Sequence, residues 1–234
     1  MTARFDEQIK LAAQLIASAR HVVALTGAGI STPSGIPDFR SPGTGEWARL
    51  DPMEVVSLTA FHHQPERFYR WLRPLAQKMA VAEPNPAHRA LAELEKLGRL
   101  QVVLTQNIDG FHRAAGSKNI IDIHGDLHDL ECMVCDWHET ITDYNAITTV
   151  PPLCPSCGAV VRPDVVLFGE QLPYDKCLAI EREWNTGFDI VFSIGTTSVF
   201  PYISQPVNYA RRNGIPTIEI NPGITTVSRI VDYH

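Results

Sequence analysis

The spacing of apolar residues predicts a helix and then a strand at the start of the chain. Apolar side chains recur at helical spacing over residues 5–19, which predicts an amphipathic helix. A β-branched run at residues 21–26 predicts a buried strand, and Gly27 and Gly29 predict a turn directly after it. Strand, glycine-rich loop and helix in this order are typical of the start of a nucleotide-binding βαβ unit.

The same alternation continues further along the chain. A second helix is predicted to begin at Asn85-Pro86, with Asn as N-cap and Pro in the first helical position, and to end at Gly98. The remaining pattern predicts strands at residues 100–105, 120–123, 188–194 and 217–220, and a helix at residues 204–213.

Two segments of different character interrupt this pattern. Residues 37–84 are rich in proline and aromatic residues, which predicts short helices and loops, and residues 126–162 hold two cysteine pairs and a proline-rich end. We predict an α/β fold with a Rossmann-like parallel sheet and helices on both faces, formed by residues 1–36, 85–125 and 163–234. The two inserts are predicted to form a small domain with a helical module and a cysteine module.

Composition and charge narrow the class of protein. The 234 residues are 44% hydrophobic and 20% charged, which suits one large domain carrying a smaller one. A net charge of −6 gives no electrostatic footprint for nucleic acid. The chain has no apolar run long enough for a membrane span, and its first ten residues lack the apolar core of a signal peptide. We therefore expect a cytoplasmic protein without a membrane partner, in a compartment where disulfides are rare.

The cysteines give the most specific chemical signal. Two C-x-x-C pairs stand 18 residues apart, and their members are Cys132, Cys135, Cys154 and Cys157. This spacing is typical of a tetrahedral zinc site, and four thiolates close the coordination sphere, so the zinc is expected to be structural. A redox pair and disulfides are the alternatives. Cys177 stands alone and is expected to be packed, while His128 and His138 are expected to be ordinary surface histidines rather than ligands.

The glycine-rich loop GAGIS at residues 27–31 is a weaker signal. It follows a predicted strand, where backbone N–H groups can face a pyrophosphate. The dehydrogenase fingerprint requires Gly or Ala where this chain has Thr32, and no convincing acidic residue ends a second strand about 20 residues further on. On its own, the loop favours a nucleotide only slightly.

Three further segments combine polar groups with positions at sheet edges. In GIPDFR at 35–40, Arg40 can meet a phosphate and Phe39 can cover a reactive sugar, or the Arg can simply pair with the nearby Asp. TQNID at 105–109 follows a strand, where open α/β sheets bind ligands, although the sequence is also good turn chemistry. His124, in HG at 124–125, is the histidine best placed to act as a base, and its alternative is a structural role.

Taken in order, these segments resemble the sirtuin family. The matching segments are GAGIS, GIPDFR, TQNID, HG, the two C-x-x-C pairs, VVLFGE at 165–170, GTTSV at 195–199 and NPG at 221–223. The resemblance covers nearly the whole chain. It implies an NAD-dependent enzyme that removes acyl groups from lysine side chains of proteins.

The resemblance also implies a reaction. NAD binds between the large and small domains, and the acyl-lysine carbonyl oxygen attacks the ribose carbon that carries nicotinamide. Nicotinamide leaves, an imidate forms, and a ribose hydroxyl attacks it. Hydrolysis then gives free lysine and O-acyl-ADP-ribose.

Site residues follow by matching positions in the motifs. The resemblance implies that His124 is the general base and that Asn107 contacts ribose and water in catalysis. The implied cofactor-binding residues are Gly27, Ala28, Gly29, Thr32, Phe39, Arg40, Gln106, Asn107, Ile108, Asp109, Gly195, Thr196, Thr197 and Asn221. The implied substrate-binding residues are Val166, Phe168 and Gly169, which receive the acyl-lysine peptide as an added β-strand.

Three departures from the family pattern matter. Thr197 replaces the usual Ser of GTS and keeps a hydroxyl. Members that favour succinyl or malonyl groups carry Tyr-x-x-Arg, whereas Tyr69 is followed here by Leu72 at that position and by Arg73 one residue late. One residue turns a helix by about 100°, so we expect a preference for acetyl or other neutral acyl groups. Family members usually continue beyond the position of His234, so the adenine contact made there is not expected from this sequence.

Three other functions compete with deacylation. A protein mono-ADP-ribosyltransferase would share the NAD pocket, and acyl-peptide products would separate the two. A non-catalytic NAD or ADP-ribose binding module would not need both His124 and Asn107. A zinc-ribbon nucleic-acid binder is disfavoured by the acidic balance.

Overall fold

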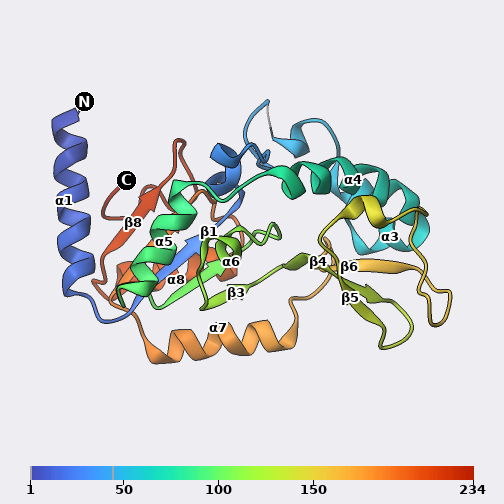
Figure 1. Ribbon diagram of the computed structural model, residues 1–234. Helices are drawn as coiled ribbons and strands as arrows, with labels where there is room; N and C mark the ends of the chain where they lie inside the picture. Colours follow the sequence, from blue (N-terminus) through green and yellow to red (C-terminus); the bar gives the residue numbers. More distant parts are fainter. Residues whose placement is uncertain (1, 44) are drawn as a thin grey trace.

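A five-stranded parallel sheet forms the centre of the larger part of the molecule (Figure 1). The computed structural model describes residues 2–43 and 45–234. The strands lie in the order β3-β2-β1-β7-β8, as a doubly wound fold requires. Their bounds are Val22–Thr26 for β1, Val102–Thr105 for β2, Ile120–Asp122 for β3, Ile190–Ile194 for β7 and Thr217–Ile220 for β8. The predicted parallel sheet is confirmed.

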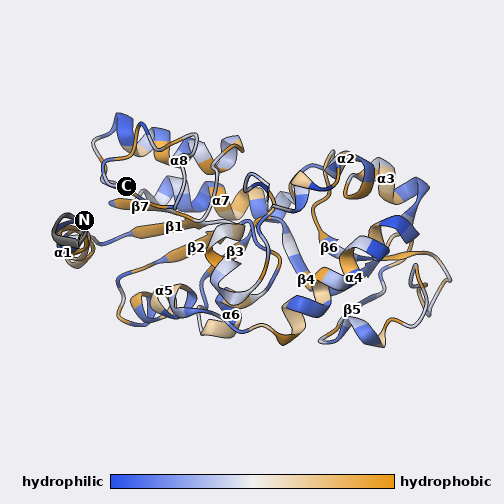
Figure 2. Ribbon diagram, turned by 90° about the horizontal axis from the view of Figure 1, so that it is seen from above, coloured by the Kyte–Doolittle hydropathy of each residue, from blue (hydrophilic) through white to orange (hydrophobic). Residues whose placement is uncertain are grey.

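Helices cover both faces of this sheet because its strands bury alternate residues on opposite sides. Val23 and Leu25 pack against the helices α7 and α8, whereas Val22 and Ala24 pack toward α1 and α5. Figure 2 shows the hydrophobic strands lying between α5 on one side and α7 and α8 on the other. The helices are α1 (Thr2–Ser18), α5 (Pro86–Lys96), the short α6 (Phe111–Ala115), α7 (Tyr174–Thr186) and α8 (Pro201–Arg212).

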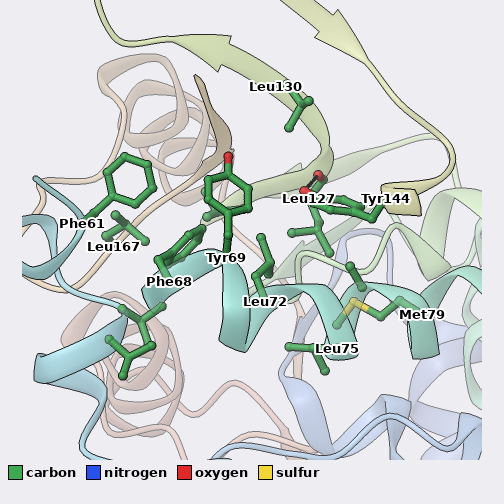
Figure 3. Packing of buried hydrophobic residues seen from close by; sticks show 14 of the residues in the cluster. Phe61, Phe68, Tyr69, Leu72, Leu75, Met79, Leu127, Leu130, Tyr144 and Leu167 are labelled. Atoms are coloured by element: carbon green, nitrogen blue, oxygen red, sulfur yellow. Dashed lines mark hydrogen bonds between the residues drawn. The ribbon is translucent and has the colours of Figure 1, made fainter. Parts of the chain in front are cut away.

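The second part of the molecule joins a helical module to a three-stranded antiparallel sheet of order β5-β4-β6. Its elements are η2 (Glu46–Ala48), α2 (Pro52–Val55), α3 (Leu58–His63), α4 (Pro65–Val81), β4 (Gly125–Cys132), β5 (His138–Thr140), η3 (Tyr144–Ala146) and β6 (Val161–Val165). Figure 3 shows Phe68, Leu72 and Leu75 of α4 beside Leu127 and Tyr144 in one buried cluster. The two inserts therefore fold onto each other.

The boundaries between the two predicted domains stay a prediction. The sequence pattern assigns Ile36 and Phe111 to the large domain, yet both pack into the buried cluster around α4. The two parts thus share apolar contacts at their junction.

The chain crosses between the sheets at His124. Strand β3 ends at Asp122 and β4 begins at Gly125, so only two residues separate the parallel sheet from the antiparallel one. Gly125 has φ +83°, and a Cβ there would lie 1.9 Å from the carbonyl oxygen of Asp164. Only glycine fits this crossing, which gives the HG pair a structural reason.

Some local predictions differ from the structure. The glycine-rich loop leads into a 3₁₀ helix, η1 (Ala28–Ser34), which contains Pro33 and is not an α-helix. Helix α7 had no predicted counterpart, because its charged sequence buries fully only Ile180. Cys177 lies on α7 and is exposed, so the expectation that it is packed was wrong.

The amphipathic helix predicted at residues 5–19 corresponds to α1. Ala12, Leu15 and Ile16 pack toward the sheet, whereas Ile9 is exposed. The side chain of Phe5 lies outside the described part of the chain. Among the described residues, none of the helices combines the length and apolar character that crossing a membrane requires.

Candidate active site

Two glycine-containing loops meet at the carboxyl ends of β1 and β7. The N–H of Gly29 donates to the carbonyl of Gly195 over 2.8 Å, and the N–H of Gly195 donates to Ile220 over 3.0 Å. A Cβ on Gly29 would lie 2.7 Å from the carbonyl oxygen of Gly195, and one on Gly27 would lie 2.7 Å from the Cβ of Thr196. This close approach requires the glycines that the sequence predicted for a nucleotide loop.

His124 lies next to these loops, at the end of β3. Its Nδ1 is 2.9 Å from the carbonyl oxygen of Gln106. Since a carbonyl only accepts, Nδ1 carries the proton and Nε2 presents the lone pair. Burial lowers the pKa of His124, the hydrogen bond to Gln106 opposes this, and the Arg40 guanidinium lowers it further. The imidazole is therefore neutral at pH 7 and can accept a proton.

Three side chains lie around His124: those of Tyr202, Phe200 and Arg40. The hydroxyl of Tyr202 is 2.6 Å from Nε2, and the Tyr202 ring stacks on Phe200 at 5.4 Å between centroids. The guanidinium of Arg40 lies 4.8 Å from the centre of the Phe200 ring. Sequence reasoning missed Phe200 and Tyr202, because no motif marks them.

A buried serine connects the predicted polar residues at the end of β2. The hydroxyl of Ser31 donates to Asp109 over 2.6 Å and accepts from the side-chain amide of Asn107 over 3.1 Å. The other carboxylate oxygen of Asp109 accepts from the N–H of Phe111 over 3.0 Å, which starts α6. Burial raises the pKa of Asp109. Asp109 therefore fits both interpretations of TQNID: one carboxylate oxygen shapes the turn before α6, and the other belongs to the polar group at the sheet edge.

Two buried histidines lie beneath this polar group, and sequence reasoning missed both. Nδ1 of His88 accepts from the N–H of Asn85, which leaves Nε2 to donate toward Ser31 over 3.4 Å. Nε2 of His112 is 2.9 Å from the hydroxyl of Thr26. Burial lowers the pKa of His88 to about 4, and burial with the neighbouring His88 lowers the pKa of His112 to about 3. Both rings are neutral at pH 7.

Gln106 links the β2 loop to the β7 loop. Its side-chain amide donates to the Thr196 hydroxyl over 2.8 Å, and the same hydroxyl accepts from the N–H of Ser198. Asn221 donates to the carbonyl of Thr196 over 3.1 Å. The carbonyl of Thr197 accepts from the Thr226 hydroxyl. The four predicted cofactor residues at positions 106, 196, 197 and 221 are therefore close together. Several of their polar groups already form hydrogen bonds with other residues of the protein.

The GIPDFR segment forms a tight turn at the mouth of the site. Asp38 accepts hydrogen bonds from the backbone N–H groups of Arg40 and Ser41, so its carboxylate is used to build the turn. No carboxylate of the described residues forms a salt bridge with Arg40. Thr32 is exposed nearby, and its hydroxyl donates to Gly29. A guanidinium in this position suits an anionic ligand.

Four aromatic side chains, here called the aromatic cluster, connect this turn to the helical module. They are Phe39, Trp47, Trp71 and Phe168. Trp47 is central, with ring centroids 5.0 Å from Phe39, 5.9 Å from Trp71 and 6.1 Å from Phe168. Two residues predicted to contact NAD or substrate, Phe39 and Phe168, thus contact one shared indole.

The predicted substrate strand follows β6. The N–H of Val166 donates to the backbone carbonyl of His124 over 2.9 Å, so this segment is hydrogen-bonded to the chain next to the imidazole. The N–H of Phe168 donates to Val56, and its carbonyl accepts from Leu58, both over 2.9 Å. The backbone of Phe168 is therefore used within the chain. The N–H of Val166 is used in the same way, so the pairing of an added strand at Val166 and Gly169 stays a prediction.

The four paired cysteines gather at the end of the antiparallel sheet. All four sulfurs lie within 4.8 Å of one another. The Cys132–Cys157 and Cys135–Cys154 sulfur pairs are 3.5 and 3.6 Å apart, far longer than a disulfide bond of about 2.05 Å. Four sulfurs bound at about 2.3 Å to one zinc ion would be roughly 3.8 Å apart. The cluster therefore fits a structural zinc ion, and the disulfide alternative is wrong.

Backbone donors support the cluster. The N–H of Val134 points to the sulfur of Cys132, and the N–H of Ser156 points to that of Cys154, each over 3.4 Å. Such donors stabilise thiolates. His138 is exposed, and His128 is bonded to Asp126 over 2.8 Å, so neither belongs to the four-sulfur cluster, as predicted.

The positions that matter for acyl selectivity lie on α4. The hydroxyl of Tyr69 donates to the carbonyl of Val161 over 2.7 Å, and Leu72 is buried in the core. Arg73 lines an outer groove of ≈380 Å³ together with Arg70 and Glu66. This groove does not include any residue of the aromatic cluster.

Comparison with known proteins decides the family. The sequence model of the Sir2 family matches residues 27–201. The chain belongs to the Sir2, or sirtuin, family. Its matched region contains every predicted site residue except Asn221.

Curated relatives of this sirtuin align with it over most of their length. NAD-dependent protein deacetylase 2 of Caldanaerobacter subterraneus subsp. tengcongensis is 44% identical over 203 residues, which cover 86% of this chain and 79% of the relative. NAD-dependent protein deacylase 2 of Pseudomonas aeruginosa is 40% identical over 230 residues, covering 96% and 90%.

Solved structures of sirtuins share the fold. A Sir2 homologue–NAD complex superimposes with a TM-score of 0.86 at 40% identity, covering 96% of this chain and 86% of the other. A Sir2–p53 peptide–NAD⁺ complex gives a TM-score of 0.85 at 35% identity, covering 96% and 91%. The architecture of this sirtuin is therefore that of enzymes seen with nucleotide and with peptide.

Proposed function

We propose that this sirtuin is an NAD-dependent protein lysine deacylase that removes acetyl or other neutral acyl groups. The observation that carries the proposal is the state of His124. Its Nδ1–H donates to the Gln106 carbonyl, its pKa is lowered by burial, and its accepting nitrogen lies 2.6 Å from the Tyr202 hydroxyl. A neutral, oriented imidazole at the sheet edge is what a general base requires. The NAD-dependent deacylase names of the relatives support the same activity.

The residues at the sheet edge suit NAD as co-substrate. Arg40, which lies 4.8 Å from the centre of the Phe200 ring, offers a guanidinium for the pyrophosphate. Asn107 and Gln106 offer amide groups for ribose hydroxyls, and Thr196 lies on the adenosine side. NAD supplies the sugar carbon to which the acyl oxygen is transferred, together with nicotinamide as the leaving group.

The side chains of this sirtuin then have separate tasks. His124 removes a proton from a ribose hydroxyl, which makes that oxygen a nucleophile. Phe39 covers the reacting sugar and excludes water, held in place by its stacking on Trp47 at 5.0 Å. Ser31 holds Asn107 and Asp109 in one arrangement, so we assign it a positioning role for the nicotinamide end of the site.

The protein substrate is proposed to bind as an added β-strand along residues 166–169. Val166 is held by His124, and Phe168 presents its side chain because its backbone is already bonded to Val56 and Leu58. Backbone pairing gives affinity with little sequence demand. The acyl-lysine stem would then pass the ring of Phe168 toward the base.

The preference for neutral acyl groups is supported by α4. Leu72 is uncharged and buried in the core, and the groove that Arg73 lines together with Tyr69 contains no residue of the aromatic cluster. We expect acetyl-lysine peptides to be turned over at least about tenfold faster than succinyl-lysine peptides. Comparable kcat/KM values for the two peptides would contradict this preference.

A product analysis tests the activity. The protein is incubated with NAD and an acetyl-lysine peptide, and mass spectrometry follows the peptide and the nucleotide. Free lysine together with O-acetyl-ADP-ribose and nicotinamide is expected, and His124→Tyr should abolish these products while the protein stays folded. A peptide that gains ADP-ribose would indicate a mono-ADP-ribosyltransferase, and NAD binding without any product would indicate a binding module.

A further inference from the structure

Both ring nitrogens of His124 form hydrogen bonds with other groups of the protein. Nδ1 donates to the carbonyl of Gln106, so Nε2 must accept the proton of the Tyr202 hydroxyl, 2.6 Å away. A neutral imidazole has only one lone pair in its ring plane. While Tyr202 donates to Nε2, no substrate hydroxyl can donate to the same nitrogen.

The base can therefore act in two ways. Tyr202 either swings away to expose Nε2, or it stays and carries the proton between the substrate hydroxyl and His124. The two cases differ in how firmly the Tyr202 ring is held.

The surroundings of Tyr202 favour a fixed ring. It lies parallel to Phe200 at 5.4 Å with 7° between the planes, and edge-on to His124 at 5.8 Å and 89°. Phe200 in turn contacts His124 edge-on at 6.0 Å and Arg40 at 4.8 Å. Aromatic pairs of this geometry stabilise each other beyond the effect of burial alone. Moving Tyr202 would break the stack and the hydrogen bond together.

We propose, on the basis of the deacylase function above, that Tyr202 is a catalytic residue that relays a proton from the ribose hydroxyl of NAD to His124. Tyr202 gives its hydroxyl proton to Nε2 and takes the proton of the ribose hydroxyl in its place. One O–H bond of Tyr202 breaks and one forms, so the phenol is unchanged. His124 becomes imidazolium, and the ribose oxygen keeps the electron pair with which it attacks the acyl carbon.

The electrostatics of the pair suit such a relay. Burial raises the pKa of Tyr202 to about 12, and the Arg40 guanidinium acts in the opposite direction. Tyr202 is thus a neutral donor at rest. The nearby positive charge stabilises the partial negative charge on its oxygen while the two protons move.

Tyr202→Phe tests the relay, because it removes one oxygen and keeps the ring stack. We expect kcat for deacylation to fall about 100-fold, the lower end of what a lost acid–base group costs, with KM for NAD within about twofold. Exchange of labelled nicotinamide into NAD in the presence of acyl peptide should persist, because nicotinamide leaves before the base acts. Tyr209→Phe on the same helix is the matched control, since Tyr209 is 52% exposed, and it should leave kcat unchanged.

A second measurement does not depend on turnover. In the ligand-free protein labelled with ¹⁵N-histidine, Nε2 of His124 should resonate as a hydrogen-bonded acceptor, and Tyr202→Phe should move it toward the value of an unbonded one. Wild-type kcat in Tyr202→Phe, or a lowered KM for NAD with undiminished kcat, would overturn the relay and make Tyr202 a displaceable cap. A wild-type protein that releases no nicotinamide with acyl peptide would instead overturn the proposed function.

Discussion

At the scale of single residues, Gly125 is the position where the smallest change should have a large effect. Its φ is +83°, and a Cβ would lie 1.9 Å from the carbonyl oxygen of Asp164. We expect Gly125→Ala to lower the free energy of unfolding by about 3 kcal/mol or more, and to displace the adjacent His124 so that deacylation falls. Urea unfolding and steady-state kinetics measure the two effects.

Gly35 provides the control for this prediction. It lies in the left-handed region at φ +88° and ψ +5°, but a Cβ there would meet nothing within 4 Å, so Gly35→Ala carries only the backbone strain of about 1–2 kcal/mol. If both variants lose the same stability, the close approach to Asp164 contributes nothing and the explanation of the HG pair is wrong.

The two buried histidines predict how stability depends on pH. Their folded pKa values, about 4 for His88 and about 3 for His112, lie below the unfolded value of about 6.5. Between these values the unfolded chain binds more protons, so stability is full above pH 6.5 and falls as the pH drops. The slope should reach up to about 1.4 kcal/mol per pH unit for each histidine.

Urea unfolding at pH 7, 6 and 5 measures this slope, with zinc content checked at each pH. Replacing His112 with Asn removes one of the two groups and should reduce the slope by about half. A free energy of unfolding that is unchanged between pH 7 and pH 5 would contradict the buried neutral state of both rings.

The residues of the site show what a sequence reveals and what it hides. The four-cysteine cluster was predictable because the spacing within each pair is local, and the place of His124 at the sheet edge was predictable because a short motif follows a predicted strand there. The role of Ser31 was not, because Asn107 and Asp109 are 76 and 78 residues away and meet it only in the fold. Tyr202, 78 residues from His124, belongs to no motif at all.

At the scale of elements, the segment after β6 is held by a buried ion pair. Arg162, of which 9% of the side chain is exposed, contacts both carboxylate oxygens of Glu170 at 2.6 and 2.8 Å. Glu170 also accepts from the N–H of Leu167 over 2.7 Å. The Glu of VVLFGE therefore shapes the proposed substrate strand, although it need not touch the substrate.

Removing the carboxylate of Glu170 should lower the stability of the fold. Glu170→Ala leaves the buried Arg162 guanidinium with only the more distant carboxylate of Glu131 at 3.5 Å, and we expect a loss of about 3 kcal/mol in the free energy of unfolding. The matched control is Glu54→Ala, which breaks the exposed pair with Arg67 and should cost no more than about 1 kcal/mol. Denaturant titration compares the two, and equal losses would contradict the role of burial.

Elements with a clear apolar period were predicted from the sequence, and those without one were not. The helix from Asn85 was predictable because its cap and its stripe are both local, and the structure adds a reciprocal bond between Asn85 and His88. Helix α7 was missed because charged residues interrupt its apolar positions. Ile180 is the buried residue of α7 that packs with Val23 and Leu25 of the sheet.

At the scale of the whole molecule, we expect loss of zinc from the cysteine cluster to lower the activity of the proposed active site, although the two are not in contact. Strand β4 runs from Gly125, next to His124, to Cys132 in the cluster. We expect Cys154→Ala to release zinc, to loosen the three-stranded sheet and to reduce deacylation at least tenfold. Metal analysis and steady-state kinetics measure these effects on the same sample.

Cys177→Ala is the control, because Cys177 is exposed on α7 and outside the cluster. This variant should keep one zinc ion per chain and full activity. If Cys154→Ala kept its zinc, the proposed ligands would be wrong; if it lost zinc but not activity, the link along β4 would be wrong.

The crossing from β3 to β4 has a consequence for motion. Since Ile123 and His124 are the only residues between the two strands, the parallel sheet and the antiparallel sheet are joined there by a very short tether. A rotation of one sheet against the other about this tether would displace His124 less than residues far from the crossing. The imidazole would then keep its place while the more distant parts of the two sheets move.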